Sequence, residues 1–313
     1  METSIEPYVA NNLATLFSLW QRTIGQEWPL TGNRFEQILL GTNSQLFVVR
    51  KDEHIVGFVV TRKDEASNGY ISALLVAPEW QRQGIGTALH QAALQYLREQ
   101  GVRRVQLGGG SPRFFPGVPE NLSAALAFFQ SQGWSIDHIT YDLVQDLRTY
   151  TTPPYVWERM KNVAVHFAIA TQDDVAELLS FEEQEFPEWL TAFQRVASLG
   201  DYADLLIGRN ESGQVVASLI LYGPQSHPDR ADALWQLLLG ENVGAIGCVG
   251  VVENMQGQGI GIALVARATE LLIGRGVEVC SIDWVVLTEF YAKLGYRVWR
   301  GYTMCWRSLS IRK

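Results

Sequence analysis

The sequence predicts an α/β protein of two tandem copies of one fold, each a mixed central β-sheet flanked by helices. Three observations support this class: the chain length, a repeated glycine-rich turn, and alternating strand and helix patterns after each turn. At 313 residues the chain is long for one domain and sufficient for two of about 150 residues. Each half is large enough to bury its own core, so no disulfide or metal is needed to stabilise it.

The repeat is clearest around two glycine-rich turns. The first, Gln81-Arg82-Gln83-Gly84-Ile85-Gly86, follows an apolar segment that ends in Leu74-Leu75-Val76. The second, Gln256-Gly257-Gln258-Gly259-Ile260-Gly261, follows an apolar segment that ends in Val249-Gly250-Val251. Both patterns predict a strand, a short turn and then a helix.

The two segments after the turns also match. Apolar residues follow Ile85 and Ile260 at steps of 4, 8, 11 and 12 residues, which is the period of a helix that packs one face on a sheet. Each helix is expected to end at a glycine, Gly101 or Gly276. Matching segments near the end of each half, 128–134 and 290–296, predict a helix end, a glycine and a new strand.

Local patterns predict the remaining elements. In the first half they predict helices over 9–24 and 122–131, and strands over 45–50, 54–62, 70–76, 104–107 and 141–147. In the second half they predict helices over 173–181 and 188–199, and strands over 165–170, 205–208, 215–222 and 245–252. Because Thr149–Pro154 ends in two prolines, it is expected to be a linker rather than a helix. The predicted domains are 1–148 and 163–313, with a linker over 149–162.

Composition excludes several classes of protein. The net charge of −8 argues against a nucleic-acid partner, which requires a basic surface; it favours solubility and, more weakly, a cationic substrate. Three cysteines without CxxC spacing predict neither a zinc site nor a disulfide framework, and we expect no metal. The N-terminus lacks the basic and apolar regions of a signal peptide, and stretches such as 260–266 are too short to span a bilayer. We therefore expect a cytoplasmic protein that does not enter membranes.

A glycine-rich turn that leads into a helix is suited to bind an anion. The first N–H groups of the helix lack backbone partners, and glycine lets the ligand approach the chain closely. The spacing excludes two nucleotide-binding motifs: a P-loop needs Lys and Ser/Thr after the last glycine, and the dinucleotide fingerprint needs a third glycine. Ile262-Ala263 and Thr87-Ala88 follow instead, and Ile262 and Leu89 occupy the position of a third glycine.

The remaining pattern, Gln-x-x-Gly-x-Gly between a strand and a helix, resembles the GNAT superfamily of acyl-CoA-dependent N-acetyltransferases. The resemblance extends over 45–147 and 163–313. It implies acetyl-CoA as cosubstrate, with 256–261 and 81–86 around the pyrophosphate of CoA and with 249–251 and 74–76 along its pantetheine arm. The alternative is a glycine turn that only begins a helix.

The resemblance also implies catalytic residues. Family members commonly carry a proton-donating tyrosine four residues before a glycine; Tyr291 stands four before Gly295, whereas the first copy has Phe129. The second half is therefore predicted to be catalytic; the alternative is that Tyr291 is only a half-buried helix residue. Ala245 and Tyr70 stand where many members carry a catalytic glutamate. Asp283 is the candidate general base, with Glu289 behind it, and a water relay or a purely local role is the alternative.

Two segments are candidates for the acceptor side. In the first half 108–119, with two aromatic residues and three prolines, resembles a segment of tandem acetyltransferases appended to β-N-acetylhexosaminidases, which makes an amino sugar conceivable as acceptor. The alternative is a structural loop that packs against the other domain. In the second half 223–241 is expected to cover either the site or only the sheet edge. The predicted function is acetyl transfer to a primary amine of a small molecule or peptide; the alternative is an acyl-CoA-binding sensor or scaffold.

Overall fold

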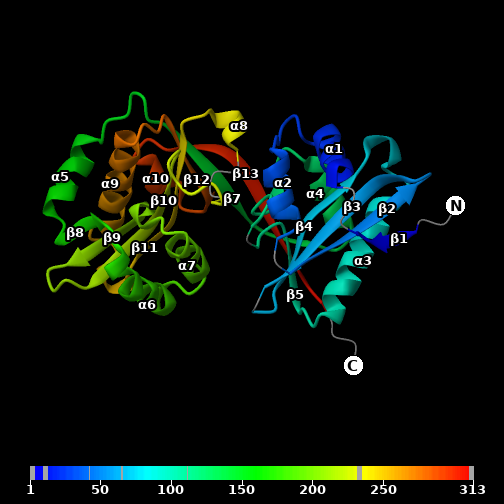
Figure 1. Cartoon of the computed structure of the whole chain (residues 1–313), viewed down its shortest axis with the longest axis horizontal. Helices are drawn as coiled ribbons and strands as arrows, with labels where there is room; N and C mark the ends of the chain where they lie inside the picture. The colour runs from blue at the N-terminus through cyan, green and yellow to red at the C-terminus, as the bar shows by residue number, and fades with distance from the viewer. Residues whose placement is uncertain are drawn as a thin grey trace. The chain divides into compact units, whose positions relative to one another are not determined.

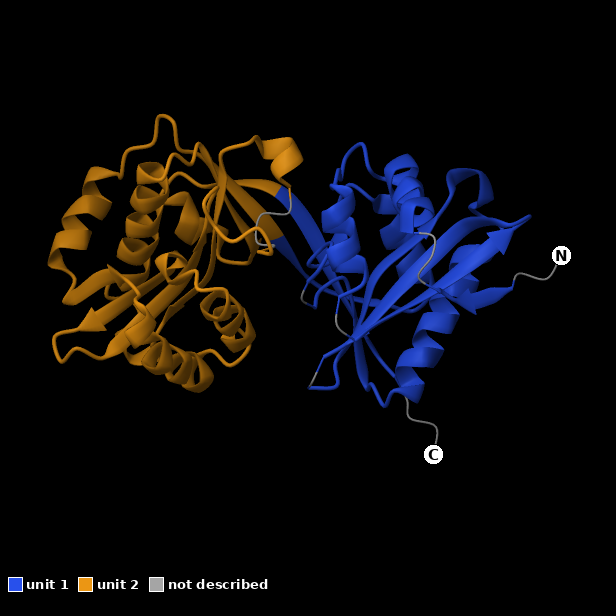
Figure 2. Cartoon of the chain, in the orientation of Figure 1, with its two compact units in different colours: residues 1–140, 300–313 blue, residues 141–299 orange. Residues whose placement is uncertain are grey.

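The computed structural model describes residues 4–9, 13–41, 43–64, 66–110, 112–230 and 235–309. These residues form a mixed α/β structure in which helices flank β-sheet, as predicted (Figure 1). The chain divides into two compact units (Figure 2). Unit 1 comprises residues 1–140 and 300–313, and unit 2 comprises residues 141–299.

Unit 1 contains a mixed sheet in the order β1-β2-β3-β4-β5-β13, with β6 paired to β13. All neighbouring pairs are antiparallel except β4 and β5. Its strands are β1 (Ile5–Pro7), β2 (Ser44–Lys51), β3 (His54–Lys63), β4 (Gly69–Val76), β5 (Arg104–Leu107), β6 (Val118–Pro119) and part of β13 (Arg297–Ser308). Its helices are α1 (Leu13–Thr23), α2 (Gly32–Leu39), η1 (Pro78–Trp80), α3 (Ile85–Glu99) and α4 (Ser123–Ser131).

Unit 2 repeats this plan with the strand order β7-β12-β11-β10-β9-β8, in which only β11 and β12 are parallel. Its strands are part of β7 (Ser135–Asp146), β8 (Val165–Ile169), β9 (Leu205–Asn210), β10 (Val215–Tyr222), β11 (Val243–Val251) and β12 (Val279–Val285). Its helices are α5 (Pro154–Asn162), η2 (Gln172–Asp174), α6 (Val175–Glu185), α7 (Leu190–Ser198), η3 (Tyr202–Asp204), α8 (Gln236–Leu239), η4 (Glu253–Met255), α9 (Ile260–Gly274) and α10 (Thr288–Ala292).

Two features differ from the sequence-based expectation. Residues 154–162, expected within a linker, form α5. Pro154 is compatible with this helix because it is the first residue, where a missing N–H breaks no helical hydrogen bond. In addition, β7 and β13 each contribute residues to both units, so the compact units are not two consecutive segments of sequence. The predicted boundaries at 148 and 163 follow the repeat in the sequence rather than these units, and they stay a prediction.

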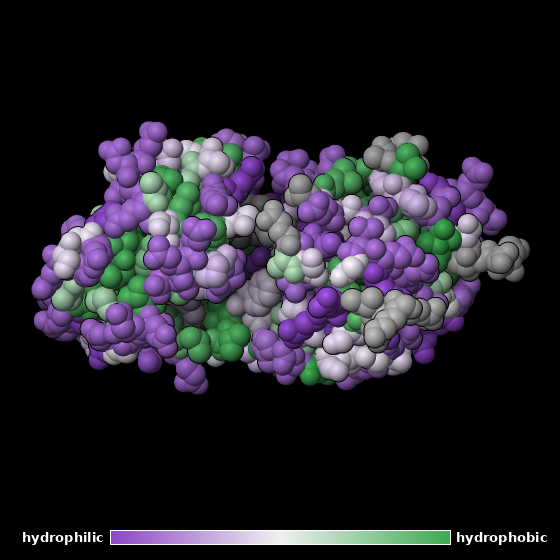
Figure 3. Space-filling model, turned by 90° about the horizontal axis from the view of Figure 1, so that it is seen from below, coloured by the Kyte–Doolittle hydropathy of each residue, from purple (hydrophilic) through white to green (hydrophobic). Residues whose placement is uncertain are grey.

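Helices cover both faces of the sheet in each unit. In unit 2, α9 and α10 pack on one face with Leu219 and Leu221 of β10, while α6 and α7 pack on the other with Ile220. Leu264 and eight other residues of α9 are buried, which makes this helix the centre of the unit 2 core. Among the described residues, no helix has the length and apolar character needed to cross a bilayer. In the view of Figure 3, hydrophilic residues cover most of the surface and hydrophobic patches are small.

Candidate active site

The two glycine turns have the same local geometry. In unit 2 the chain leaves β11, passes through η4 and enters α9 at Gly259, whose φ is +90°. In unit 1 it leaves β4, passes through η1 and enters α3 at Gly84, whose φ is +84°. The residues two positions earlier, Gly257 and Arg82, also have positive φ, +75° and +60°. The repeat in the sequence is therefore a repeat of backbone conformation.

Glutamine side chains hold each turn closed. Gln256 Nε2 donates to the carbonyl oxygen of Val251 at 3.0 Å, and Gln81 Nε2 donates to that of Val76 at 2.9 Å. These amides are used within the turn, so the groups left to meet an anion are backbone N–H groups. In α9 the first helical bond is donated by Ala263 to Gly259, so the N–H groups that precede it at the helix start point outward without a helical acceptor.

The turns differ in the side chains beside them. A Cβ atom placed on Gly84 would meet no atom within 4 Å, whereas one placed on Gly259 would lie 2.4 Å from Cδ of Arg159. Arg159 belongs to α5, and its Nη1 atom lies 3.3 Å from the same position. A guanidinium group from another helix thus lies at the unit 2 turn, where the loop itself has Gly257 in place of the arginine of unit 1.

The strands before the turns separate from their parallel neighbours. β11 pairs with β12 only through 243–245, although β11 continues to Val251. β4 pairs with β5 only through 69–71, although β4 continues to Val76. The predicted pantetheine-binding residues all lie beyond these pairings, where one edge of the strand no longer bonds to the adjacent strand: Val249, Gly250 and Val251 in unit 2, and Leu74, Leu75 and Val76 in unit 1.

Tyr291 lies on α10 beside the core of unit 2 and is half-buried. Burial raises the pKa of its hydroxyl to about 12, and an electrostatic interaction with Cys248 adds to the shift. Cys248 stands on β11 at φ +52°, where the register between β10 and β11 shifts. Tyr291 is therefore near the part of β11 that has left β12, and it is protonated at neutral pH. Its counterpart Phe129 is buried between the rings of His90 and Trp134.

Asp283 lies in β12, half-buried, next to Trp284, whose φ is +56°. The register between β12 and β7 shifts here, and Trp284 N donates to Asp142 Oδ1 at 3.5 Å. Asp283 is thus held in an irregular part of the strand. Glu289 is exposed in the first turn of α10.

The segment 108–119 packs inside unit 1. Phe114 and Phe115 are buried, and their rings lie 4.7 and 5.8 Å from that of Trp20. Gln106 Nε2 donates to the carbonyl oxygen of Pro116 at 2.7 Å. The described part of this segment therefore belongs to the unit 1 core; residue 111 lies outside the described residues.

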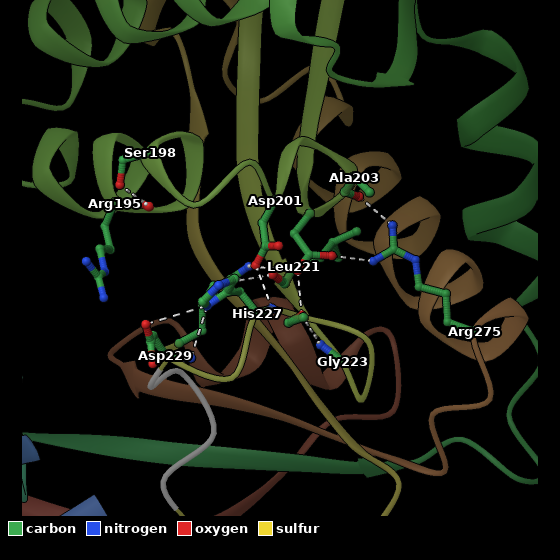
Figure 4. Close-up of polar contacts among 12 residues, drawn as sticks. Arg195, Ser198, Asp201, Ala203, Leu221, Gly223, His227, Asp229 and Arg275 are labelled. Carbon is green, nitrogen blue, oxygen red and sulfur yellow. Dashed lines mark hydrogen bonds and ion pairs between the residues drawn. The ribbon is translucent and has the colours of Figure 1, made fainter.

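The segment 223–241 is fixed by ion pairs at the other end of α9 from the glycine turn. Arg230, of which 1% of the side chain is exposed, donates to Asp204 Oδ2 at 2.7 Å, and Arg275 donates to Asp204 Oδ1 at 2.6 Å. Figure 4 shows this network, in which the guanidinium group of Arg275 points toward Ala203. Since 16 residues of helix rise roughly 24 Å, the hollow beside Arg275 is remote from Gly259. Residues 231–234 lie outside the described residues.

Glu182 is not among the site residues predicted from the sequence. This residue of α6 is completely buried and accepts a hydrogen bond from Ser218 Oγ at 2.5 Å. Burial raises its pKa to about 7, although the Ser218 bond acts in the opposite direction. Glu182 is followed by Glu183, Gln184 and Glu185, a polar stretch that is typical of a solvated helix face. Only a residue-by-residue alignment of the two copies would have indicated that Glu182 is buried.

Comparison with known proteins agrees with the repeat. The model of the acetyltransferase (GNAT) family matches residues 12–134 and again 170–296. A solved structure of a fungal multi-domain GH3 β-N-acetylglucosaminidase, described as having a GCN5-related glucosamine N-acetyltransferase region, is 37% identical with a TM-score of 0.93. The alignment covers 98% of this chain but 38% of that protein, so the chain spans well under half of its relative.

Two further structures share the tandem fold. A GCN5-related N-acetyltransferase from Sphaerobacter thermophilus is 17% identical with a TM-score of 0.71, and the alignment covers 99% of this chain and 96% of that one. A tandem GNAT protein from the clavulanic acid biosynthesis pathway is 15% identical with a TM-score of 0.66, and 98% of each chain is covered. No curated protein gives a significant match. The family model matches both halves and one relative is more than a third identical over nearly the whole length, so the chain belongs to the GNAT family of acetyltransferases.

Proposed function

We propose that unit 2 transfers an acetyl group from acetyl-CoA to a primary amine of a small molecule, directly and with both substrates bound. The observation that carries this proposal is the free edge of β11 at 249–251, which leads straight into the glycine turn of α9. A strand edge can hydrogen-bond an extended amide-containing arm, and a helix start can bind a pyrophosphate. Both features occur in one continuous segment, in the order in which CoA would need them.

The residues present fit CoA. In this proposal the N–H groups of Ile260 and Gly261 at the start of α9 bind the pyrophosphate, helped by the positive end of the helix dipole. Arg159 supplies a cation at the same place, since its side chain lies against Gly259. The edge of β11 then directs the pantetheine arm toward Cys248 and Tyr291.

Acetyl-CoA supplies the acyl group as a thioester, and the side chains manage protons. Tyr291 gives its proton to the departing thiolate sulfur. With a pKa of about 12, it remains protonated at neutral pH and so has a proton to give. Phe129 has no such proton to give. We therefore propose that unit 1 is mainly architectural, with 81–86 and 74–76 retaining a cleft of CoA-binding type.

We propose an amino sugar as the acceptor class. The support is the 37% identical region described as a glucosamine N-acetyltransferase, together with a net charge of −8 that suits a cationic acceptor. The same negative charge argues against a nucleic-acid partner. The alternative remains an acyl-CoA-binding protein without turnover, which the same turn and strand edge would serve equally well.

A matched pair of variants tests the cofactor site. Gly259→Asp and Gly84→Asp both place a carboxylate at a positive-φ position before a helix, so their costs in backbone strain are similar. We expect Gly259→Asp to abolish activity with acetyl-CoA and glucosamine, measured as free thiol, while Gly84→Asp retains it. Calorimetry should show the corresponding loss of CoA binding to unit 2. Equal activity in both variants would contradict the assignment of catalysis to unit 2.

Tyr291→Phe separates an enzyme from a binder. Loss of general acid assistance costs about 10²- to 10⁴-fold, and a thiolate is a good leaving group, so we expect kcat to fall roughly 10- to 10²-fold. CoA affinity should not change, because the ring remains. The control is Tyr155→Phe, which removes another hydroxyl of unit 2, bonded to the carbonyl oxygen of Lys293 at 2.5 Å. A pure binder would release no thiol in any of these proteins.

A further inference from the structure

Glu182 combines complete burial with an unsatisfied oxygen. Oε1 accepts the Ser218 hydrogen bond, whereas Oε2 is buried and has no hydrogen-bond partner among the described residues. The charged residue that acts on it is Glu188, a second carboxylate, from the connection before α7. A buried carboxylate oxygen without a donor is costly, and native proteins rarely keep one without a reason.

The two copies differ sharply at this place. α1 buries Leu16, Leu19 and Trp20, and α6 buries Leu178, Phe181 and Glu182 at the same spacing. Aligned on these residues, Glu182 takes the position of Trp20. A carboxylate therefore stands where the other copy has the largest apolar side chain.

The neighbouring strands change in the same way. Ser218 of β10 is directly opposite Gly250 of β11, and in unit 1 Phe58 is directly opposite Leu75. The 175-residue offset between the glycine turns relates Gly250 to Leu75, and hence Ser218 to Phe58. Trp20 and Phe58 are fully buried, and the ring of Phe35 lies 5.7 and 6.4 Å from theirs.

At these three equivalent positions unit 1 has Trp20, Phe58 and Leu75. Unit 2 has Glu182, Ser218 and Gly250 there. A purely structural core would gain nothing from this exchange, since apolar packing at the same place is stabilising and a lone carboxylate is not. The polar set is also next to the candidate site: Gly250 belongs to the free edge of β11, and Ser218 lies one strand away. The ring of Phe186 lies against Gly250, 2.5 Å from where a Cβ atom would be, and stacks on Trp189.

We propose that Glu182 is the proton acceptor for the amine substrate, which meets Oε2 beside Ser218 and Gly250. This inference rests on the proposed function. The acceptor ammonium gives one proton to Oε2, and the freed lone pair of nitrogen attacks the thioester carbonyl carbon. The carbon–sulfur bond breaks and the sulfur takes the proton of Tyr291. The new amide nitrogen returns its extra proton to the tyrosinate, and Glu182 releases its proton to solvent.

The protonation behaviour of Glu182 suits this role. A proton acceptor works best when its pKa lies near the ambient pH, and that of Glu182 is about 7. Above that pH the carboxylate can take a proton, and below it the group is already protonated. Activity should therefore fall about tenfold per pH unit as the pH drops below about 7.

Two variants test the assignment in the full chain, with acetyl-CoA and glucosamine as substrates. Glu182→Gln should lower kcat about 10²- to 10⁴-fold with unchanged CoA affinity by calorimetry. Ser218→Ala removes the hydrogen bond that favours the carboxylate, so the acidic limb of kcat against pH should move up by about one pH unit while the high-pH plateau remains. A limb caused by the acceptor ammonium itself would not move with Ser218→Ala.

The outcomes are distinct. If the parent protein turns over but Glu182→Gln keeps its kcat, or Ser218→Ala leaves the limb in place, the role of Glu182 is refuted and the acetyltransferase proposal stands. If the parent protein shows no turnover although it binds CoA, both proposals fail and the CoA-binding alternative holds. Circular dichroism and the CoA affinity of each variant establish that it is folded.

Discussion

Replacing Glu182 by Gln should make the protein more stable at alkaline pH but not at acidic pH. In the unfolded chain the carboxyl titrates near its ordinary pKa of 4.5, and in the fold it titrates near 7. Between these values the folded protein binds more protons than the unfolded chain, so the free energy of unfolding falls as the pH rises through this window. Glutamine has no proton to lose, so the variant should not show this fall.

The size of the effect follows from the two pKa values. At 1.36 kcal/mol per pKa unit, the free energy of unfolding lost between pH 5 and pH 8 is about 3 kcal/mol for a fully buried group. The melting temperature of a unit of this size changes by about 2–4 °C per kcal/mol. The melting temperature of the variant minus that of the parent protein should therefore be roughly 6–12 °C greater at pH 8 than at pH 5.

Differential scanning calorimetry of the full chain at pH 5, 6, 7 and 8 measures this difference. The matched control is Glu185→Gln, which removes an exposed carboxylate from the same helix, α6, and should show no pH-dependent gain. A difference between Glu182→Gln and the parent protein that stays constant from pH 5 to pH 8 would refute the reasoning. It would mean that the buried carboxylate is already ionised at pH 5.

Three further predictions concern stability. Arg230→Met removes the buried one of the two arginines that pair with Asp204, and it should cost about 1.5–3 kcal/mol of unfolding free energy in urea titrations because Arg275 still compensates the carboxylate; a cost below about 1 kcal/mol would contradict a structural ion network. Leu264→Ala, at a fully buried position of α9, should cost about 2–5 kcal/mol, measured in the same way. Gly259→Ala should destabilise the protein by about 1–3 kcal/mol from backbone strain, with a further cost from the clash with Arg159. That further cost should vanish in an Arg159→Ala background, and additive effects in thermal melts would show that the two side chains do not touch.

Local patterns account for the parts of the fold that the sequence predicted well. The glycine turns, α3 and α9 were predicted because a 3.6-residue period and a positive-φ glycine are encoded within about fifteen consecutive residues. The helix α5 was not predicted, because the two prolines that end Thr149–Pro154 indicate a linker rather than a helix. Proline is compatible with the first turn of a helix, so composition alone could not decide the outcome.

The contents of the site depended on contacts between distant parts of the chain. Tyr291 and Asp283 were named from spacing and resemblance, but the proximity of Tyr291 to Cys248 depends on how α10 packs beside β11. Likewise, the lack of pairing between the end of β11 and β12 is a property of two strands, which neither segment shows by itself. The sequence located the glycine turn that we propose binds an anion, and the fold decided what surrounds it.

From the sequence alone, the tandem repeat, the fold class and the family of this protein could be determined, because each depends on short motifs and their spacing. Only the tertiary structure revealed that Glu182, in a run of polar residues, is buried against Ser218 36 residues later in the chain. The physical reason is that the environment of a side chain is set by the packing of α6 on β10. That packing removes the Glu182 carboxylate from water, and burial raises its pKa.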